Sequence, residues 1–177
     1  PAGPEGKAEK AEEHLFVTDC QVDTDMELLL PESYIGNISE RIRLYRELDN
    51  LRNEEGIHLF ESRLNDRFGP LPEPTRELLN VVRLRWLAMK LGMEKLILKN
   101  GQMVIHFVSN PLSPYYQSPV FSRILGFVQR QSQKYRMKEG ANRLTLTVQD
   151  IPTVQKAIRT LEIMLNGQDR DEKPVSP

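Results

Sequence analysis

The sequence predicts an α+β fold, in which three N-terminal helices pack with a four-stranded, mostly antiparallel sheet and two further helices in the order ββαββα. The first observation is the spacing of apolar residues, which recur every three or four positions between about residues 38 and 91 and switch to every second position directly after Gly92. The second is the order of the later segments, since two strands followed by a helix occur twice. A chain of 177 residues, of which 39% are hydrophobic, is long enough to bury a core.

Residues 14–30 form an extended pattern that ends at Pro31 and predicts one or two strands. A first helix follows, with Asn37 or Ser39 as its N-cap, because the next apolar residues fall at helical spacing. The residues expected on its buried face are Ile38, Ile42, Tyr45, Leu48 and Leu51. A second helix is predicted over about residues 54–67, and its expected buried residues are Ile57, Phe60, Leu64 and Phe68.

The stretch LNDRFGPLPEP connects the second helix to the third. Gly69 lies where a helix favours a left-handed residue just past its end, and Pro70 cannot continue the helix. Pro72 and Pro74 fit the first turn of the next helix, whose early N–H groups have no partner inside the helix. The stretch is therefore predicted to be a structural joint, formed by Phe68, Gly69, Pro70, Leu71 and Pro72. The third helix, about residues 73–91, has a broad apolar surface that indicates a central position.

The second half of the chain reads as two hairpins, each followed by a helix. After Gly92, two apolar runs flank the dipeptide Asn100–Gly101, which strongly favours a tight hairpin. A helix is predicted over about residues 118–131, and a second hairpin turns near Gly140. The last helix is predicted over about residues 152–165, and both helices are expected on one face of the sheet.

Composition suggests the domain boundaries. Residues 1–13 and 167–177 are polar and charged, with almost nothing to bury, so they are predicted to be a disordered leader and a disordered tail. The folded domain is expected at residues 14–166, with a helical half at 31–91 and a ββαββα half at 92–166. Because the first residue is Pro rather than Met, we expect a fragment of a longer protein.

The sequence shows no pattern of an enzyme, cofactor or metal site. The net charge of −1 gives no general attraction to nucleic acid or membranes, and no apolar run approaches the ~20 residues that span a bilayer. The single cysteine, Cys20, fits a reducing compartment. A phosphate-binding loop is absent, and the histidines are spread over separate elements. Asp23 and Asp25 could form an acid–base pair, but nothing nearby supplies a nucleophile.

Two charged surfaces leave different functions open. On the third helix, Arg76, Arg83 and Lys90 repeat every seven residues, with Arg85 beside them, so they could contact nucleic-acid phosphates or simply form a solvated face. The first two helices mix acids with arginines, which suits specific protein–protein pairing but also suits any solvent-exposed helix. The residues alone favour a binding module over an enzyme.

Several spaced motifs carry a resemblance to a known family. They are Leu30, Pro31, Tyr34 and Ile35, then Arg41 and Tyr45, then the run from Asp66 to Gly69, then Leu71 and Pro72, and finally Lys90 to Gly92. With these motifs, about residues 20–165 resemble the C-terminal domain of the bacterial transcription-repair coupling factor (TRCF, or Mfd).

The resemblance implies a cytoplasmic bacterial parent protein that is an ATP-driven DNA translocase. In that family the parent displaces stalled RNA polymerase and recruits UvrA for nucleotide-excision repair. The C-terminal domain is implied to be non-catalytic and autoinhibitory, without a cofactor. It clasps a UvrB-like N-terminal module, masks the UvrA-binding surface of that module and restrains the motor. Neither direct DNA binding nor membrane contact is expected.

The resemblance also implies a partner-binding site late in the second helix. Asp66 matches one acidic position that contacts the N-terminal module, whereas Arg63 stands where the family has another acid. Glu61 and Arg67 are the neighbouring candidates, although residues two apart on a helix do not share a face. The alternative function is an accessory nucleic-acid-binding module that uses Arg76, Arg83, Arg85 and Lys90.

Overall fold

The computed structural model describes residues 15–131 and 133–167. The predicted leader and residues 168–177 of the predicted tail lie outside the described residues. The helices are α1 (Ile38–Asp49), α2 (Glu54–Phe68), α3 (Glu73–Lys90), α4 (Pro119–Arg130) and α5 (Val154–Asn166), with a short 3₁₀ helix, η1 (Pro114–Gln117). The strands are β1 (Gln21–Thr24), β2 (Met93–Lys99), β3 (Gln102–Phe107), β4 (Tyr135–Glu139) and β5 (Leu144–Val148).

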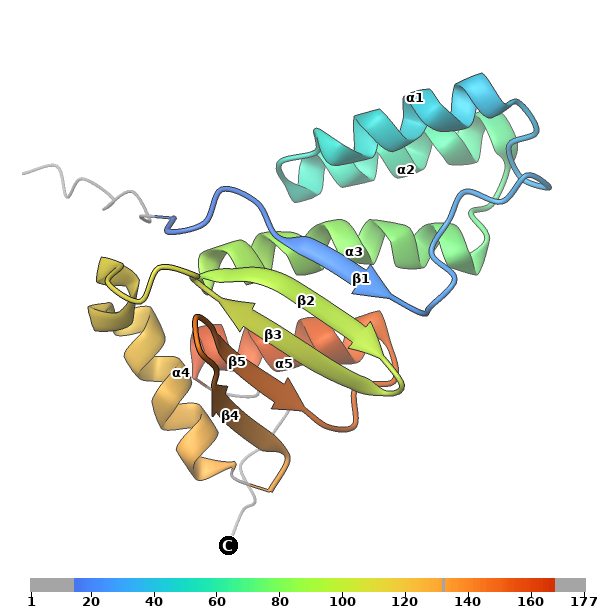
Figure 1. The fold of residues 1–177 in the computed structure, drawn as a ribbon. Coiled ribbons are helices and arrows are strands. Elements are labelled where there is room, and N and C mark those ends of the chain that lie inside the picture. Colours follow the sequence, from blue (N-terminus) through green and yellow to red (C-terminus); the bar gives the residue numbers. More distant parts are fainter. Residues whose placement is uncertain (1–14, 132, 168–177) are drawn as a thin grey trace, which may run out of the picture.

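The α+β class and the ββαββα half are confirmed, but the sheet has five strands in the order β1-β2-β3-β5-β4 (Figure 1). The predicted count of four was wrong because β1 joins the sheet beside β2, in parallel. β1 comes from the extended N-terminal segment, and its partner follows only after three intervening helices. Local pattern reveals such a strand but not a partner so distant in the chain.

The β2–β3 hairpin turns at Asn100–Gly101, as predicted. Both residues have positive φ, at 56° and 71°, which is the backbone shape that the right-handed twist of paired strands requires. The second hairpin closes beyond Glu139, where the N–H of Gly140 donates to the carbonyl of Arg143 at 2.8 Å.

One face of the sheet is buried and the other is open. Alternating residues such as Leu96, Ile105 and Leu146 are fully buried and form one core with residues of α3, α4 and α5. The opposite face carries half-buried residues, among them Ile97 and Val104. Two helices were expected on the buried face, and α3 packs there as a third (Figure 1).

A second core joins α1, α2 and α3, and α3 contributes to both cores. Leu79 and Val82 face the helical core, whereas Leu84 and Ala88 face the sheet core. This double role explains the broad apolar surface that the sequence showed on the third helix.

The predicted buried face of α1 was wrong in part. Ile38 and Ile42 are 65% and 47% exposed, whereas Leu44 and Leu48 are buried. Two apolar stripes of similar quality run along α1, and spacing alone does not select between them. Packing against α2 selects the stripe of Leu44 and Leu48, because these residues meet Phe60 in the helical core.

Candidate protein interface

The segment at 30–35 is tied to the helical hairpin by side-chain hydrogen bonds. Tyr45 Oη accepts from the N–H of Leu30 at 2.8 Å, Arg41 Nη1 donates to the carbonyl of Ile35 at 2.6 Å, and Tyr34 Oη donates to the carbonyl of Gly69 at 2.8 Å. Leu30 and Ile35 themselves are buried in the helical core. These bonds fix the start of α1 and the end of α2 against one another.

All five residues of the predicted joint lie at the connection of α2 to α3. Gly69 follows the last residue of α2 with φ at +86°, and its N–H donates to the carbonyl of Asn65 at 2.9 Å. Phe68 packs edge-on against Tyr34, with 5.7 Å between ring centroids. Leu71 is buried, Pro72 is the N-cap of α3, and Pro70 is exposed. The geometry is that of a packed helix-to-helix connection.

Arg63 and Arg67 are both occupied within the hairpin. The guanidinium of Arg63 pairs with Glu47 of α1, and that of Arg67 pairs with Glu40. Glu40 also accepts from Arg43 at 3.2 Å. Because the two arginine side chains are exposed, each pair contributes little stability, but both guanidinium groups already have acidic partners within the chain.

Asp66 is different. Its side chain is exposed, and among residues 15–131 and 133–167 its carboxylate forms no ion pair. It lies in the last turn of α2, where the helix dipole disfavours a negative charge. The same residue lines a hollow of about 500 Å³ between α1 and α2, whose other lining residues are Arg43, Leu44, Glu47, Phe60, Arg63, Leu64, Arg67 and Phe68.

Glu61 does not share this hollow. It lines a separate polar hollow of about 450 Å³, together with residues of α3 and with Gln155 of α5. The structure therefore brings Arg63, Asp66 and Arg67 together and leaves Glu61 apart, as the spacing of two residues along a helix requires.

Of the four basic residues predicted on one face of α3, two form ion pairs and two do not, among the described residues. The guanidinium of Arg83 donates two hydrogen bonds to the carboxylate of Glu54, at 2.7 and 3.0 Å, and this pairing lowers the pKa of Glu54. Arg85 also pairs, as described next. Arg76 and Lys90 are exposed, and neither forms an ion pair among the described residues.

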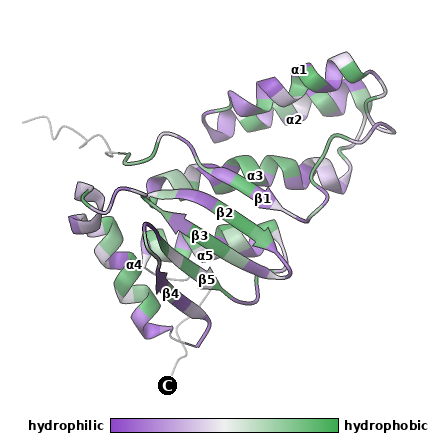
Figure 2. Cartoon of the chain, viewed as in Figure 1, coloured by the Kyte–Doolittle hydropathy of each residue, from purple (hydrophilic) through white to green (hydrophobic). Residues whose placement is uncertain are grey.

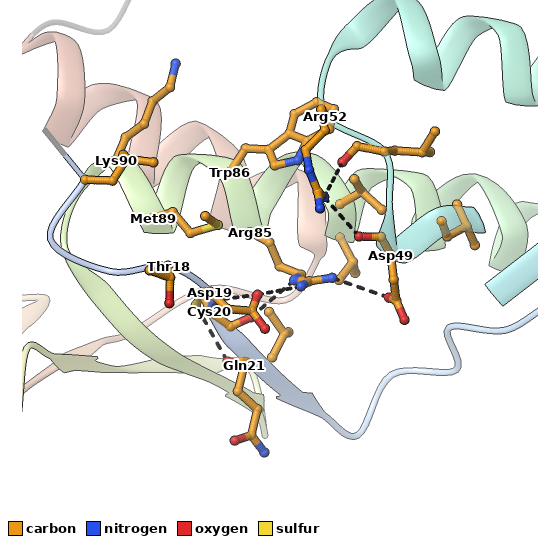
Figure 3. A pocket seen from close by; sticks show the side chains of 16 residues that line it. Thr18, Asp19, Cys20, Gln21, Asp49, Arg52, Arg85, Trp86, Met89 and Lys90 are labelled. Atoms are coloured by element: carbon orange, nitrogen blue, oxygen red, sulfur yellow. Dashed lines mark hydrogen bonds and ion pairs between the residues drawn. The ribbon is translucent and has the colours of Figure 1, made fainter. Parts of the chain in front are cut away.

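A further hollow, of about 1060 Å³, lies between the segment that leads into β1, the end of α1, and α3 (Figure 3). Arg85 lies in its wall, where it donates to Asp19 at 2.5 Å and to the carbonyl of Cys20 at 3.2 Å, and lies 3.6 Å from Asp49. The hydrogen bond from Arg85 is the main reason that the pKa of Asp19 is lowered. Sequence reasoning missed this network, because its three acceptors come from two segments distant from α3 in the chain.

The other acidic candidates have structural roles. Asp23 pairs with Lys95 at 3.3 Å, and Asp25 accepts from the N–H of Asn100 at 3.0 Å, so each carboxylate has a partner in the β2–β3 hairpin. Within the part of the chain that the structure describes, no group of three potential metal ligands occurs. No helix in that part is long and apolar enough to cross a membrane.

Comparisons with known proteins point to one family. The family model described as TRCF domain matches residues 24–118, more than half of the chain. The transcription-repair-coupling factor of Escherichia coli (strain K12) is 34% identical over 140 residues, which are 78% of this chain and 11% of that protein. That of Rickettsia prowazekii (strain Madrid E) is 32% identical over 117 residues, 66% of this chain and 10% of that protein. The chain thus spans about a tenth of the length of these relatives.

A solved structure supports the fold independently. The crystal structure of the C-terminal domain of transcription-repair coupling factor matches with a TM-score of 0.65 and covers 85% of this chain and 96% of that chain. At 15% sequence identity, this likeness concerns the fold alone.

Proposed function

Because the chain belongs to the TRCF domain family, we propose that it is the non-catalytic regulatory domain of a transcription-repair coupling factor and that it binds another module of the same parent chain. The parent would be an ATP-dependent DNA translocase of the bacterial cytoplasm that displaces stalled RNA polymerase and recruits UvrA to damaged DNA. In this proposal the domain holds the UvrB-like N-terminal module, masks its UvrA-binding surface and restrains the motor.

The observation that carries this proposal is the placement of Asp66. The arginines beside it already have partners on α1, whereas Asp66 is an acid of the hollow that forms no ion pair among the described residues. A basic side chain of the partner would satisfy Asp66 and would also relieve its unfavourable position in the last turn of α2. The apolar floor of the hollow, which includes Phe60 and Leu64, adds burial to that charge pairing.

Such a clasp must be strong enough to dominate and weak enough to open. A closed state favoured by a few kcal/mol is almost fully populated. A ligand that binds the open state more tightly by a larger free energy makes the open state the populated one. Polymerase engagement would supply that preference in the parent. A polar contact of modest area suits such a switch better than a large apolar interface does.

The proposal is tested by calorimetric titration of this chain with the isolated UvrB-like module of its parent, at two salt concentrations. We expect binding that weakens with salt, and we expect Asp66→Lys to reduce the affinity at least about tenfold, because a charge pair across an interface is replaced by repulsion. The same substitution should leave the stability of the domain unchanged or raise it by about 0.3–1 kcal/mol, since a cation suits the last turn of a helix.

The matched control is Glu162→Lys, which makes the same charge change on an exposed position of α5. It should leave the affinity unchanged, and Glu61→Lys tests whether the opposite side of α2 takes part. In the full parent, Asp66→Lys should raise UvrA binding and ATP hydrolysis in the absence of polymerase. Unaltered affinity and unaltered activity of the Asp66 variant would remove this residue, and with it the proposed clasp, from the mechanism.

A nucleic-acid-binding role of α3 has less support. Arg83 and Arg85 are neutralised by acids of this chain, which leaves Arg76 and Lys90 as the exposed cations of the predicted face. Two phosphate contacts give a weak and only mildly salt-dependent affinity. Titration with duplex DNA at low salt tests this alternative, and tight binding with a steep salt dependence would favour it over the clasp.

A further inference from the structure

The outer edge of the sheet at β4 offers unpaired backbone groups. β4 lies at one end of the strand order, and no strand among the described residues pairs with its outer side (Figure 1). On its inner side β4 pairs with β5, in a register that places Met137 opposite Leu146. The N–H of Gln149 donates to the carbonyl of Lys134, which identifies the hydrogen-bonded pairs of this ladder.

The pairing pattern shows which groups of β4 point outward. Hydrogen-bonded pairs alternate along an antiparallel ladder, so the pair of Lys134 and Gln149 is followed by the pairs that contain Arg136 and Lys138. The N–H and carbonyl groups of Tyr135, Met137 and Glu139 therefore point away from β5. An extended segment laid along this edge can bond to these three residues without disturbing the sheet.

The side chains of β4 differ in charge between the two faces. Arg136 and Lys138 lie on the open face of the sheet, are exposed and form no ion pair among the described residues. Tyr135 and Met137 lie on the other face and are half-buried against the sheet core. Figure 2 shows β4 largely in the hydrophilic colour, beside the more hydrophobic β3 and β5.

This charge pattern disfavours self-association through the edge. Two copies of β4 paired antiparallel about Met137 would place Arg136 of one copy opposite Lys138 of the other. These positions would be the non-hydrogen-bonded pairs, in which opposing side chains approach most closely, so like charges there are unfavourable. Cationic residues on an edge strand also discourage general aggregation.

The same pattern attracts an acidic strand. We propose that the β4 edge receives an extended segment of a partner protein as a sixth strand, with acidic side chains opposite Arg136 and Lys138 and an apolar side chain opposite Met137. Acids at alternating positions would meet both cations on the open face, while the residue between them would extend the half-buried surface of Tyr135 and Met137. This inference is independent of the clasp proposed for α2.

A single-stranded nucleic acid is a poorer candidate for this surface. Such ligands need aromatic side chains on which bases stack, in addition to cations. The open face beside β4 presents Thr145, Thr147 and Val104, and the nearby ring of His106 already contacts Arg143 at 2.8 Å.

The test is an NMR titration of the ¹⁵N-labelled chain with the capped peptide Thr-Val-Glu-Val-Glu-Val-Thr, compared with its counterpart that has Lys in place of both Glu. We expect the acidic peptide to protect the amides of Tyr135, Met137 and Glu139 from hydrogen exchange and the basic peptide to bind at least about tenfold more weakly. No protection of these three amides, equal affinity for the two peptides, or binding of an oligothymidylate in place of the acidic peptide would overturn the proposal.

Two sets of variants sharpen the test. Met137→Pro removes an outward N–H that β5 does not use, so it should abolish peptide binding, whereas Met137→Ala should keep the affinity within about threefold. The double variant Arg136→Glu with Lys138→Glu should bind the basic peptide in preference to the acidic one. This reversal needs only exposed side chains, so it decides the question even if the proline variant fails to fold.

Discussion

Replacing Gly92 by Ala should destabilise this domain more than the same change at any of its surface turns. Gly92 joins α3 to β2 with φ at +73°, and a Cβ added there would lie 2.1 Å from Cε2 and 2.5 Å from Cζ of Tyr115. Tyr115 has little room to move. Its ring is fully buried among Phe107, Phe121 and other aromatic rings, and its hydroxyl donates to the carbonyl of Leu91 at 2.6 Å.

The expected loss is the sum of a backbone cost and a packing cost. A non-glycine residue with positive φ costs about 1–2 kcal/mol. Forcing an extra methyl group into a close-packed core costs about 1–3 kcal/mol more. Gly92→Ala should therefore lower the free energy of unfolding by about 2–5 kcal/mol.

Gly101→Ala separates the two costs. Gly101 has φ at +71°, but an added Cβ there meets nothing within 4 Å, so only the backbone cost of about 1–2 kcal/mol applies. Urea unfolding of both variants can be followed by fluorescence of Trp86, the one tryptophan, and by circular dichroism. If Gly92→Ala costs no more than Gly101→Ala, the close packing of Tyr115 against Gly92 does not hold in solution, and the reasoning is refuted.

Two further predictions concern the joint and the cysteine. Tyr34→Phe removes the hydroxyl that donates to the carbonyls of Gly69 and Leu64 but keeps the ring beside Phe68, so it should cost about 0.5–1.5 kcal/mol in urea unfolding. A loss near zero would mean that water replaces this hydrogen bond freely. Burial raises the pKa of Cys20 to about 12, and the residue is only 1% exposed, so a thiol reagent at pH 8 should modify it only as fast as the domain opens. Fast modification of the folded chain would contradict this burial.

Local features of the fold followed from the sequence, whereas choices that depend on distant packing did not. The turn at Asn100–Gly101 was predictable because positive φ at two successive residues is a local demand. The end of α2 was predictable for a similar reason, since Pro70 cannot continue a helix. The buried stripe of α1 and the partner of β1 depend instead on which surfaces meet after folding.

The candidate site also has features that could be predicted from the sequence and features that depend on distant packing. The family resemblance singled out Asp66, and the structure adds that its carboxylate forms no ion pair among the described residues. It could not be read from the sequence that Arg63 and Arg67 would find glutamates on α1, because helical spacing does not fix how two helices align. The network of Arg85 with Asp19 and Asp49 escaped prediction for the same physical reason.

The residues that carry the family resemblance and the residue proposed to bind the partner have different physical duties. The side chains of Tyr34, Arg41 and Tyr45 form hydrogen bonds with the backbone of this chain, so these polar groups already have partners when the domain is alone. Asp66 lies in the last turn of α2, the helix that those residues hold in place, and its carboxylate forms no ion pair among the described residues. Arg63 fits this division, because it pairs with Glu47 inside the hairpin, at a position where the resemblance implies a second acid. Under the proposed function, one acidic residue of α2 rather than two would contact the partner. The affinity would then depend more strongly on how rigidly the joint holds Asp66 in position.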